Sequence, residues 1–348
     1  MACSENRQQR VSGCDASPLL IGPLPLEGRA LLAPMSGVTD VGFRRIARRL
    51  GASLVMTEMV ASDDYVRGET ESRLRAEGEG IEPHVVQIAG CEPYSMGEAA
   101  RLGEASGAAI IDINMGCPAK RVVGGYAGSA LMRDLPLAVR LIEAVIGAVR
   151  IPVTVKMRLG WDEATRNAPE LARRAEVAGA ALVSVHGRTR CQFYDGKADW
   201  AAIRAVKEAV SIPVIANGDC LSFEDAARIM ALSGADGVMI GRAAMGRPWF
   251  VGQVADYLTS GTARPSPAAA ERSVVCLAHY RTLLERFGSR PGLRHARKHL
   301  AAYAERASLD GFPFARVARS RLVVSEDPRE VERLLAAMFQ DQAEAEAA

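Results

Sequence analysis

The chain has 348 residues, of which 49% are hydrophobic and 24% are charged, and its formal net charge is +2. This composition excludes a disordered chain, and the chain is long enough for one large domain and a smaller one. The small net charge identifies no class of partner, so any electrostatic signal must lie in the distribution of charge along the sequence.

Residues 1–24 are polar and contain Pro and Gly, so we expect a flexible N-terminal arm. Beyond it, apolar runs rich in Val and Ile alternate with amphipathic segments. Because these runs are continuously apolar, they predict strands that are buried on both faces, as in a parallel sheet. Eight such runs occur, at residues 30–37, 52–59, 83–90, 108–117, 152–160, 181–188, 213–219 and 237–245.

Eight strand–helix units predict an α/β fold, a (β/α)8 TIM barrel spanning residues 25–262. The segments between the runs have apolar residues at three- and four-residue intervals, and several end in Gly, as helices do. An open doubly wound sheet is the alternative. The first strand–helix turn lacks the GxGxxG of the dinucleotide-binding version of that fold.

Beyond about residue 265 the strand pattern stops. A linker, ARPSPAAAE, leads into three helical stretches, SVVCLAHYRTLLERFG, LRHARKHLAAYAER and PREVERLLAAMFQ. They predict a small all-helical bundle over residues 268–338, followed by an acidic frayed tail at 339–348. Between Arg272 and Arg321 there are eleven Lys or Arg against three Asp or Glu. A basic domain of this kind suits a nucleic acid, although a solvated helix face gives the same pattern.

Membrane and disulfide signals are weak throughout. No apolar run reaches the roughly 18 residues of a membrane span, and the N-terminus lacks the apolar region of a signal peptide. The seven cysteines are odd in number, scattered and without a CxxC pair, which argues against disulfides and a structural zinc site. We therefore expect a cytoplasmic monomer that binds neither a membrane nor a metal.

Polar or flexible residues end each apolar run, and this is the end of a barrel where active sites form. Since buried polar groups need partners, their recurrence at one end of eight strands indicates a shared ligand. In chain order these residues are Pro34, Met35, Ser36, Thr57, Glu58, Gln87, Asn114, Cys117, Lys156, Arg158, His186, Arg188, Asn217, Gly218, Asp219, Gly241 and Arg242.

Some of these positions suggest particular chemistry. The NGD of residues 217–219 and the GR of residues 241–242 follow the last two strands, where barrels often bind phosphate, although two ordinary turns are the alternative. Lys156, inside an apolar strand, needs an electron-rich partner, which is either the edge of a flavin or a carbonyl that forms a Schiff base. His186 either donates to a phosphate or substrate carbonyl or is a hydrogen-bonded core histidine.

Eight segments of the chain, taken in order, closely resemble the tRNA-dihydrouridine synthases, nearest to the bacterial group. They are LAPMSGVTD, VVQIAG, DINMGCPAK, GGYAGSAL, VKMRLGWD, VHGRTR, IANGD and GADGVMIGRAAMGRPW, covering residues 28–250. The basic RHARKHLAAY at 294–303 is similar to that family's helical C-terminal domain. The resemblance implies a flavoenzyme that reduces the C5–C6 double bond of particular uridines in tRNA with FMN and NADPH.

The resemblance also implies roles for single residues. Cys117 matches the catalytic acid, and residues 34–36 match the segment that lies against the flavin. Gln87 and Lys156 match contacts to the flavin ring, and His186 matches a contact to FMN or substrate. The phosphate end would be held by Asn217, Gly218, Asp219, Gly241 and Arg242.

The reaction itself favours a thiol as the acid. The flavin delivers a hydride to C6 of the uracil, NADPH or NADH restores the flavin, and the protein must supply a proton at C5. A thiol has an ordinary pKa of about 8.5 and stays protonated near neutral pH, whereas a carboxylic acid has lost its proton. We therefore expect Cys117 to be a proton donor, neither a nucleophile nor a metal ligand.

The remaining polar residues are expected to contact the tRNA. A uridine must leave its stack to reach a barrel, which costs a few kcal/mol that phosphate contacts have to offset. Asn114, Arg158 and Arg188 are expected at the base or nearby phosphates, and Lys120 and Arg121 on a glycine-rich loop that closes over it. On the basic helices, the candidates are Arg294, Arg297 and Lys298, with Arg290, His295 and His299 at the same spacing.

Three other functions stay open. A flavin barrel acting on a free pyrimidine, like dihydroorotate dehydrogenases, shares the barrel and the acid but leaves the basic helices unexplained. A barrel lyase with Lys156 as a Schiff base would need no flavin. A non-catalytic tRNA-binding module would have no use for Cys117.

Overall fold

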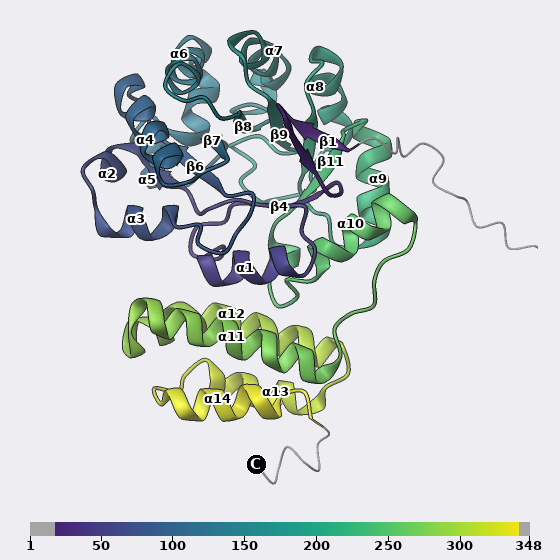
Figure 1. Ribbon diagram of the computed structural model, residues 1–348. Helices are drawn as coiled ribbons and strands as arrows, with labels where there is room; N and C mark the ends of the chain where they lie inside the picture. Colours follow the sequence, from purple (N-terminus) through teal and green to yellow (C-terminus); the bar gives the residue numbers. More distant parts are fainter. Residues whose placement is uncertain (1–17, 341–348) are drawn as a thin grey trace, which may run out of the picture.

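The computed structural model describes residues 18–340. In this part of the chain, nine strands form one parallel sheet in the order β4-β3-β11-β10-β9-β8-β7-β6-β5, ringed by helices (Figure 1). The strands are β3 (Ala30–Leu32), β4 (Leu54–Val55), β5 (Val60–Ala61), β6 (Val85–Ala89), β7 (Ile110–Met115), β8 (Val153–Arg158), β9 (Leu182–His186), β10 (Val214–Asn217) and β11 (Gly237–Ile240).

The sheet closes into a barrel through its second apolar run. That run supplies two short strands, β4 and β5, which lie at opposite ends of the strand order. Between them, Met56 forms a bridge with Val85 of β6, and the N–H of Thr57 donates to the carbonyl of Val85 at 3.1 Å. The predicted (β/α)8 barrel is therefore confirmed, and only the run at 52–59 is split.

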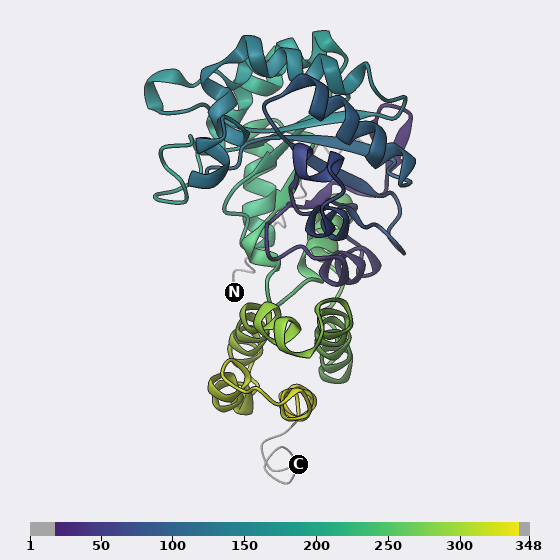
Figure 2. The same ribbon diagram turned by 90° about the vertical axis from the view of Figure 1, so that its left-hand side faces the viewer.

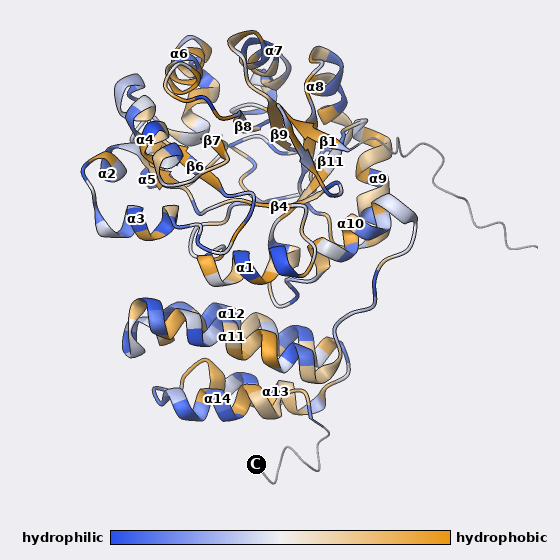
Figure 3. Cartoon of the chain, in the orientation of Figure 1, coloured by the Kyte–Doolittle hydropathy of each residue, from blue (hydrophilic) through white to orange (hydrophobic). Residues whose placement is uncertain are grey.

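Helices cover the outer face of the barrel, so its strands are mostly apolar (Figure 3), and every residue of β6, β7 and β9 is buried. Local sequence sets their ends: the Asp40 carboxylate accepts from Phe43 N–H and caps α1, and Ser222 caps α9 in the same way. The helices are α1 (Val41–Arg49), α2 (Ser62–Val66), α3 (Thr70–Ala76), α4 (Pro93–Ala105), α5 (Lys120–Gly124), α6 (Leu135–Ile146), α7 (Ala168–Ala178), α8 (Arg204–Ala209), α9 (Phe223–Ser233) and α10 (Phe250–Ser260).

The expectation of a flexible arm over residues 1–24 is wrong for its described part. β1 (Leu19–Ile21) and β2 (Leu24–Leu26) form an antiparallel hairpin. Leu19, Ile21 and Leu26 are buried against the first residues of the barrel strands, such as Val85 and Ile110, so the hairpin covers the N-terminal end of the barrel. Burial of these leucines outweighs the Pro and Gly that suggested a loose segment. Residues 1–17 lie outside the described residues.

The C-terminal part is helical, as predicted, and its described residues hold four helices where the sequence suggested three. They are α11 (Ala269–Phe287), α12 (Ser289–Leu309), α13 (Pro313–Leu322) and α14 (Pro328–Ala337). The sequence analysis missed α13 because its buried face is small, mainly Ala315, Ala318 and Leu322. Phe339 packs against Phe312 with ring centroids 5.3 Å apart, so the predicted tail begins too early.

The helical bundle is docked on the barrel through α11 and α12, which lie next to α1, whereas α13 and α14 lie on the far side (Figures 1 and 2). Ile46 of α1 and Val275 of α11 share a buried cluster with Trp249. The approach is close at Gly246, where a Cβ would meet the carbonyl oxygen of Ala302 at 2.3 Å. No helix in the described residues is both long and apolar enough to cross a membrane.

We predict that Leu300→Ala destabilises the helical bundle by about 2–5 kcal/mol, because it leaves a cavity at a fully buried position. Leu300 is 1% exposed, whereas Leu309, on the same helix, is 74% exposed. Urea unfolding followed by circular dichroism measures the change, with Leu309→Ala as the matched control. Equal stability of the two variants would contradict the packing described here.

Candidate active site

The C-terminal ends of the parallel strands form one face of the barrel, here called the mouth. Strand-end residues predicted from the sequence meet there: Asn114 Nδ2 donates to Gln87 Oε1 at 2.8 Å, and Lys156 Nζ donates to Asn217 Oδ1 at 3.3 Å. These four side chains come from β6, β7, β8 and β10. The mouth is therefore a built cluster of polar groups at the end of an apolar barrel.

Cys117 lies just beyond β7 in a turn whose backbone is held from both sides. Asn114 Oδ1 accepts from the N–H groups of Gly116 at 3.2 Å and Cys117 at 2.9 Å. The carbonyl of Cys117 accepts from the N–H of Ser129 at 3.1 Å and from its hydroxyl at 2.8 Å. With both backbone groups fixed, the Cα–Cβ bond of this half-buried cysteine has a defined direction.

A chain of buried hydrogen bonds connects this turn to the barrel interior. The Asp112 carboxylate accepts from Gln87 Nε2 at 2.6 Å and from Thr154 Oγ1 at 2.5 Å. Gln87 then accepts from Asn114, whose own oxygen holds the Cys117 turn. Burial raises the pKa of Asp112 to about 6, because it outweighs the hydrogen bonds from Gln87 and Thr154 and the charge of Lys156.

The structure gives Asn114 and Gln87 a structural task that the sequence analysis did not predict. Each uses both ends of its amide within this chain, while the contacts of Asn114 to substrate and of Gln87 to the flavin ring stay predictions. Buried amides satisfy their hydrogen bonds first, and these two do so with each other. They position Cys117.

Arg158 was expected at the substrate, but its guanidinium binds backbone carbonyls. It donates to Gly116 O at 2.9 Å, Thr189 O at 2.8 Å and Phe193 O at 2.7 Å, and it is 2% exposed. Although burial lowers the pKa of Arg158 to about 10, the group stays charged at neutral pH. It fastens the Cys117 turn to the loop after β9.

Arg188 is likewise turned inward, against the prediction of a substrate contact. Its guanidinium, 2% exposed, forms an ion pair with Asp219 at 2.6 Å and donates to the carbonyls of Asp195 and Gly196. Asp219 was expected at a phosphate, but its carboxylate accepts from Arg188 and from Ala198 N–H. A carboxylate repels phosphate, so any role of Asp219 there runs through its backbone.

Lys156 stands out because its ammonium is poorly satisfied. Its hydrogen-bond partner is the neutral Asn217 oxygen at 3.3 Å, and Ser184, its register partner on β9, has a buried hydroxyl without a hydrogen bond. Burial, then repulsion from Arg158, lowers the pKa of Lys156 to about 8, while Asp112 and Cys117 act in the opposite direction. An electron-rich ligand edge at this position would satisfy both groups.

His186 lies beside Lys156 at the end of β9 and is 8% exposed. Burial, and after it the charges of Lys156, Arg158, Arg188 and Arg242, hold the pKa of His186 well below its ordinary value. The ring is therefore neutral at physiological pH. It serves as a hydrogen-bonding group, which agrees with both uses expected from the sequence.

Tyr194 lies over this cationic floor, and the sequence analysis missed it. Its ring is 50% exposed, with Arg158 at 5.5 Å, Arg242 at 4.8 Å and the His186 ring centroid at 6.3 Å. Cation–π contacts of this kind hold an aromatic face at the rim of the mouth. Asp112, Thr154 and Ser129 also escaped notice, because nothing in their spacing marks them.

The predicted phosphate end is present as two turns near Arg242. Gly218 has a φ of 123°, and a Cβ there would meet Ala198 Cβ at 2.7 Å and His186 Cδ2 at 3.0 Å, so only glycine fits. Gly241 has open space, with Met35 Sδ at 3.6 Å from a built Cβ. Arg242 is exposed and lies 3.6 Å from Asp219, leaving its charge available to a ligand.

Pro34, Met35 and Ser36 form the loop between β3 and α1, with Pro34 and Met35 half-buried and Ser36 exposed. The Met35 carbonyl accepts from the N–H groups of Val38 and Thr39, which folds the loop back on itself. A Cβ on Gly37 would lie 3.1 Å from Lys298 Nζ. This places a basic side chain of the helical bundle directly beside the loop.

The other residues predicted to contact RNA differ in how exposed they are. Lys120, Arg121, Arg290 and Arg294 are exposed, and Arg297 and Lys298 are half-buried. Residues 120–133, expected as an open glycine-rich loop, form α5 and a 3-10 helix, Gly128–Arg133. His299 is wrongly grouped with the basic face: it is 2% exposed and turned toward Asp40.

A parallel barrel with a fixed thiol and a buried ammonium at its mouth has the architecture of a barrel enzyme. The fold is shared with solved structures. The histamine dehydrogenase from Rhizobium sp. 4-9 matches with a TM-score of 0.52 and 14% identity over 76% of this chain and 50% of that chain. A 2-naphthoyl-CoA reductase complex matches with a TM-score of 0.54 and 12% identity over 69% and 51%.

Sequence relatives identify the family. The family model "Dihydrouridine synthase (Dus)" matches residues 31–344. A "Probable tRNA-dihydrouridine synthase" of Rhizobium leguminosarum bv. phaseoli is 53% identical over 88% of this chain and 94% of its own length. A "tRNA-dihydrouridine synthase B" of Xanthomonas axonopodis pv. citri is 49% identical over 82% and 86%. The chain belongs to the dihydrouridine synthase family, which confirms the resemblance seen in the sequence.

We predict that the stability difference between wild type and Asp112→Asn depends on pH. Because the pKa of Asp112 is about 6 in the folded state and about 3.9 unfolded, its contribution is full below about pH 4 and is lost as pH rises through 6. Between pH 4 and pH 7 the variant should therefore gain about 2 kcal/mol relative to wild type.

Urea unfolding at several pH values measures this difference. Asp195→Asn, at an exposed carboxylate of the same mouth, is the matched control for loss of one acid. A difference that does not change with pH for Asp112→Asn would show that Asp112 is ionised throughout.

Proposed function

We propose that this protein is an FMN-dependent tRNA-dihydrouridine synthase of the cytoplasm, which reduces the C5–C6 double bond of uridines in tRNA with NADPH as reductant. The observation that carries the proposal is the Cys117 turn, held by Asn114 and Ser129 at the mouth of the barrel. Family membership supports the reaction type. The basic helical bundle supports tRNA rather than a free pyrimidine as substrate.

The donor groups at the mouth fit a flavin. Lys156 has a buried ammonium with one weak neutral partner, and Asn217 lies beside it. The flavin N1/O2 edge, which becomes negative on reduction, provides the electron-rich partner that this pair lacks. Pro34 and Met35 offer an apolar loop for the ring, and the Gly218 turn with the exposed Arg242 offers a place for its phosphate. Lys156 thus holds the ring through charge rather than through a Schiff base.

A bound reduced flavin supplies the hydride for C6 of the uracil. Cys117 then donates the thiol proton to C5, on the side that its fixed backbone presents. His186, neutral and beside the cationic floor, hydrogen-bonds a uracil carbonyl or the ring. Tyr194 covers the site from the rim and excludes water from the reacting atoms.

The tRNA is gripped by both parts of the protein. Lys298 of α12 lies beside Gly37 of the barrel loop, which makes the basic helix continuous with the mouth. Arg294 is exposed one turn earlier on the same helix, and Lys120 and Arg121 are exposed just after the Cys117 turn. Phosphate contacts from these side chains offset the cost of turning a uridine out of its stack.

We predict that Cys117→Ala lowers uridine reduction by about 100- to 10,000-fold, the usual contribution of a general acid. Flavin content and NADPH oxidation by the protein should persist, because Cys117 contributes only the proton. Dihydrouridine formed in unmodified tRNA is measured by mass spectrometry. Cys191→Ala, which removes an exposed thiol from the loop after β9, is the matched control and should stay active.

Loss of flavin together with activity in Cys117→Ala would contradict the assignment of this cysteine as acid. Full activity of Cys117→Ala would contradict the proposed mechanism itself.

We predict that Arg294→Gln/Lys298→Gln weakens tRNA binding and lowers the slope of log affinity against log salt by about two, one per lost phosphate contact. Arg316→Gln/Arg319→Gln removes the same charge from exposed positions on α13, away from the barrel, and is the matched control (Figure 1). Filter binding over a series of salt concentrations measures both. Equal slopes for the two double variants would mean that α12 is a solvated face.

A further inference from the structure

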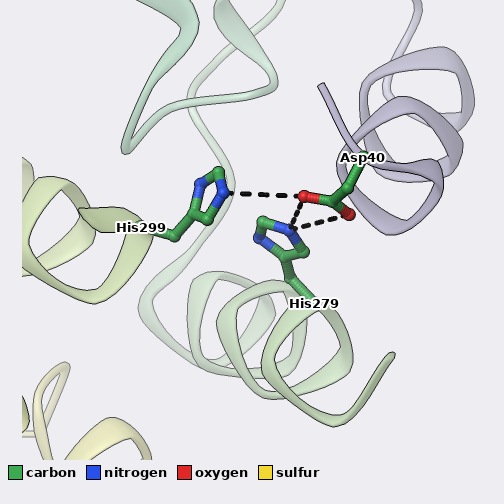
Figure 4. A group of neighbouring side chains, drawn as sticks. All are labelled: Asp40, His279 and His299. Carbon is green, nitrogen blue, oxygen red and sulfur yellow. Dashed lines mark hydrogen bonds and ion pairs between the residues drawn. The ribbon is translucent and has the colours of Figure 1, made fainter. Parts of the chain in front are cut away.

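Three metal-binding side chains are buried together where the helical bundle meets the barrel. Asp40 caps α1 of the barrel, His279 comes from α11 and His299 from α12, and both imidazoles face the carboxylate (Figure 4). They are 7%, 0% and 2% exposed, respectively. One ligand atom from each can be chosen so that all three lie within 4.8 Å of one another.

Two of the distances between these atoms are close to those between ligands around one ion. His279 Nε2 lies 3.0 Å and His299 Nε2 lies 3.5 Å from Asp40 Oδ2. Around a tetrahedral ion with bonds of about 2.0–2.2 Å, neighbouring ligand atoms are roughly 3.3–3.5 Å apart. Small side-chain rotations would therefore complete the coordination.

Hydrogen bonding alone does not account for His299. Neither of its ring nitrogens has a hydrogen-bond partner, although both are buried, and such groups are rare in folded proteins. His299 and Asp40 also line a cavity of about 70 Å³ that extends to Glu58 and His295. This volume holds at least one water molecule, so a fourth ligand has room.

The protonation state of His299 suits a metal ligand. Burial, followed by the nearby His279, holds the pKa of His299 well below its ordinary value, so its ring is neutral. For Asp40, burial acts to raise the pKa, but His279, His299 and the Phe43 N–H together lower it, so the carboxyl is ionised. Metals bind neutral imidazole and ionised carboxylate.

The second nitrogen of His279 has a hydrogen-bond partner that holds the ring in place. His279 Nδ1 lies 3.0 Å from the hydroxyl of Tyr303, which fixes the ring with Nε2 toward Asp40. The charges around the cluster are mixed. Arg44 opposes a cation, but its guanidinium is directed to the carbonyls of Thr39 and Glu77, while the carboxylate of Glu58 lines the same cavity.

We propose that Asp40, His279 and His299 bind one divalent transition-metal ion of the zinc class, which joins the helical bundle to the barrel. Two imidazoles and one carboxylate are a common zinc set, with the fourth position open to the cavity. The absence of a CxxC pair led the sequence analysis to expect no metal. A search for cysteine pairs cannot detect this site, because its ligands contain no cysteine and lie far apart along the chain.

Zinc binding to the full-length protein tests the proposal. Protein stripped with a chelator is titrated with zinc sulfate, and bound metal is counted by mass spectrometry and its ligands identified by X-ray absorption. We expect one equivalent with nitrogen and oxygen ligands, and a higher midpoint of thermal unfolding when zinc is bound. His299→Asn should lower zinc affinity at least tenfold, whereas His295→Asn, at an exposed histidine of the same cavity, should not.

Asp40→Asn provides a second variant, since asparagine still caps α1 but loses the charge that binds the ion. If His299→Asn does not fold, the zinc affinity of Asp40→Asn decides between the outcomes. Three results would overturn the proposal: no zinc bound by wild type, sulfur ligands in the absorption spectrum, or undiminished affinity in the folded variants.

Discussion

The carboxyl group of Asp112 controls the direction of a thiol five residues further along the chain. Inside the barrel it must find donors, and Gln87 and Thr154 provide them. Gln87 is thereby forced to present its oxygen to Asn114, and Asn114 to present its oxygen to the backbone of Cys117. If the amide of Gln87 or Asn114 were rotated by 180°, two donors or two acceptors would face each other in this series of hydrogen bonds. The orientation of both amides is therefore fixed.

Lys156 depends on the same carboxyl group through charge rather than contact. Burial and the charge of Arg158 both disfavour the charged form of Lys156, whereas the charge of Asp112 favours it. An electron-rich ligand at the mouth would favour the charged form further. The site is thus incomplete as a protein structure alone. Burial, and after it the positive charges of Lys156, Arg158, Arg188 and Arg242, keep His186 neutral. These charges also suit the mouth to an anionic or electron-rich ligand.

The barrel was predictable because buried parallel strands leave a plain pattern, a continuous apolar run followed by a helical period. Features that depend on few residues were not. The β1–β2 hairpin rests on three leucine and isoleucine side chains, and α13 on two alanines and a leucine, too few to show a period. The split of the second strand follows from the pairing of Met56 with Val85, a contact that no local pattern contains.

For the site, the sequence predicted which residues lie at the mouth but not which of them bind each other. Asn114, Arg158, Arg188 and Asp219 were predicted to contact ligands, and the structure shows in addition that each holds a neighbouring segment in place. A position at the end of a strand tells where the Cα of a residue lies. The hydrogen-bond partner of its side chain, however, often comes from a loop that is distant in the sequence. Tyr194 reaches the mouth from such a loop and Ser129 from a short 3-10 helix, so their types and spacing gave no signal.

The order in which the strands pair has a consequence for the synthesis of the chain. β3 lies between β4 and β11, so Leu31 cannot find its partner Met239 until some two hundred further residues have left the ribosome. Asp40, which caps the next helix, can contact His279 and His299 only after still more of the chain has been made. Contacts this distant in sequence slow folding. The nascent N-terminal half therefore exposes unpaired strand edges during translation, and such edges promote aggregation until their partners are made.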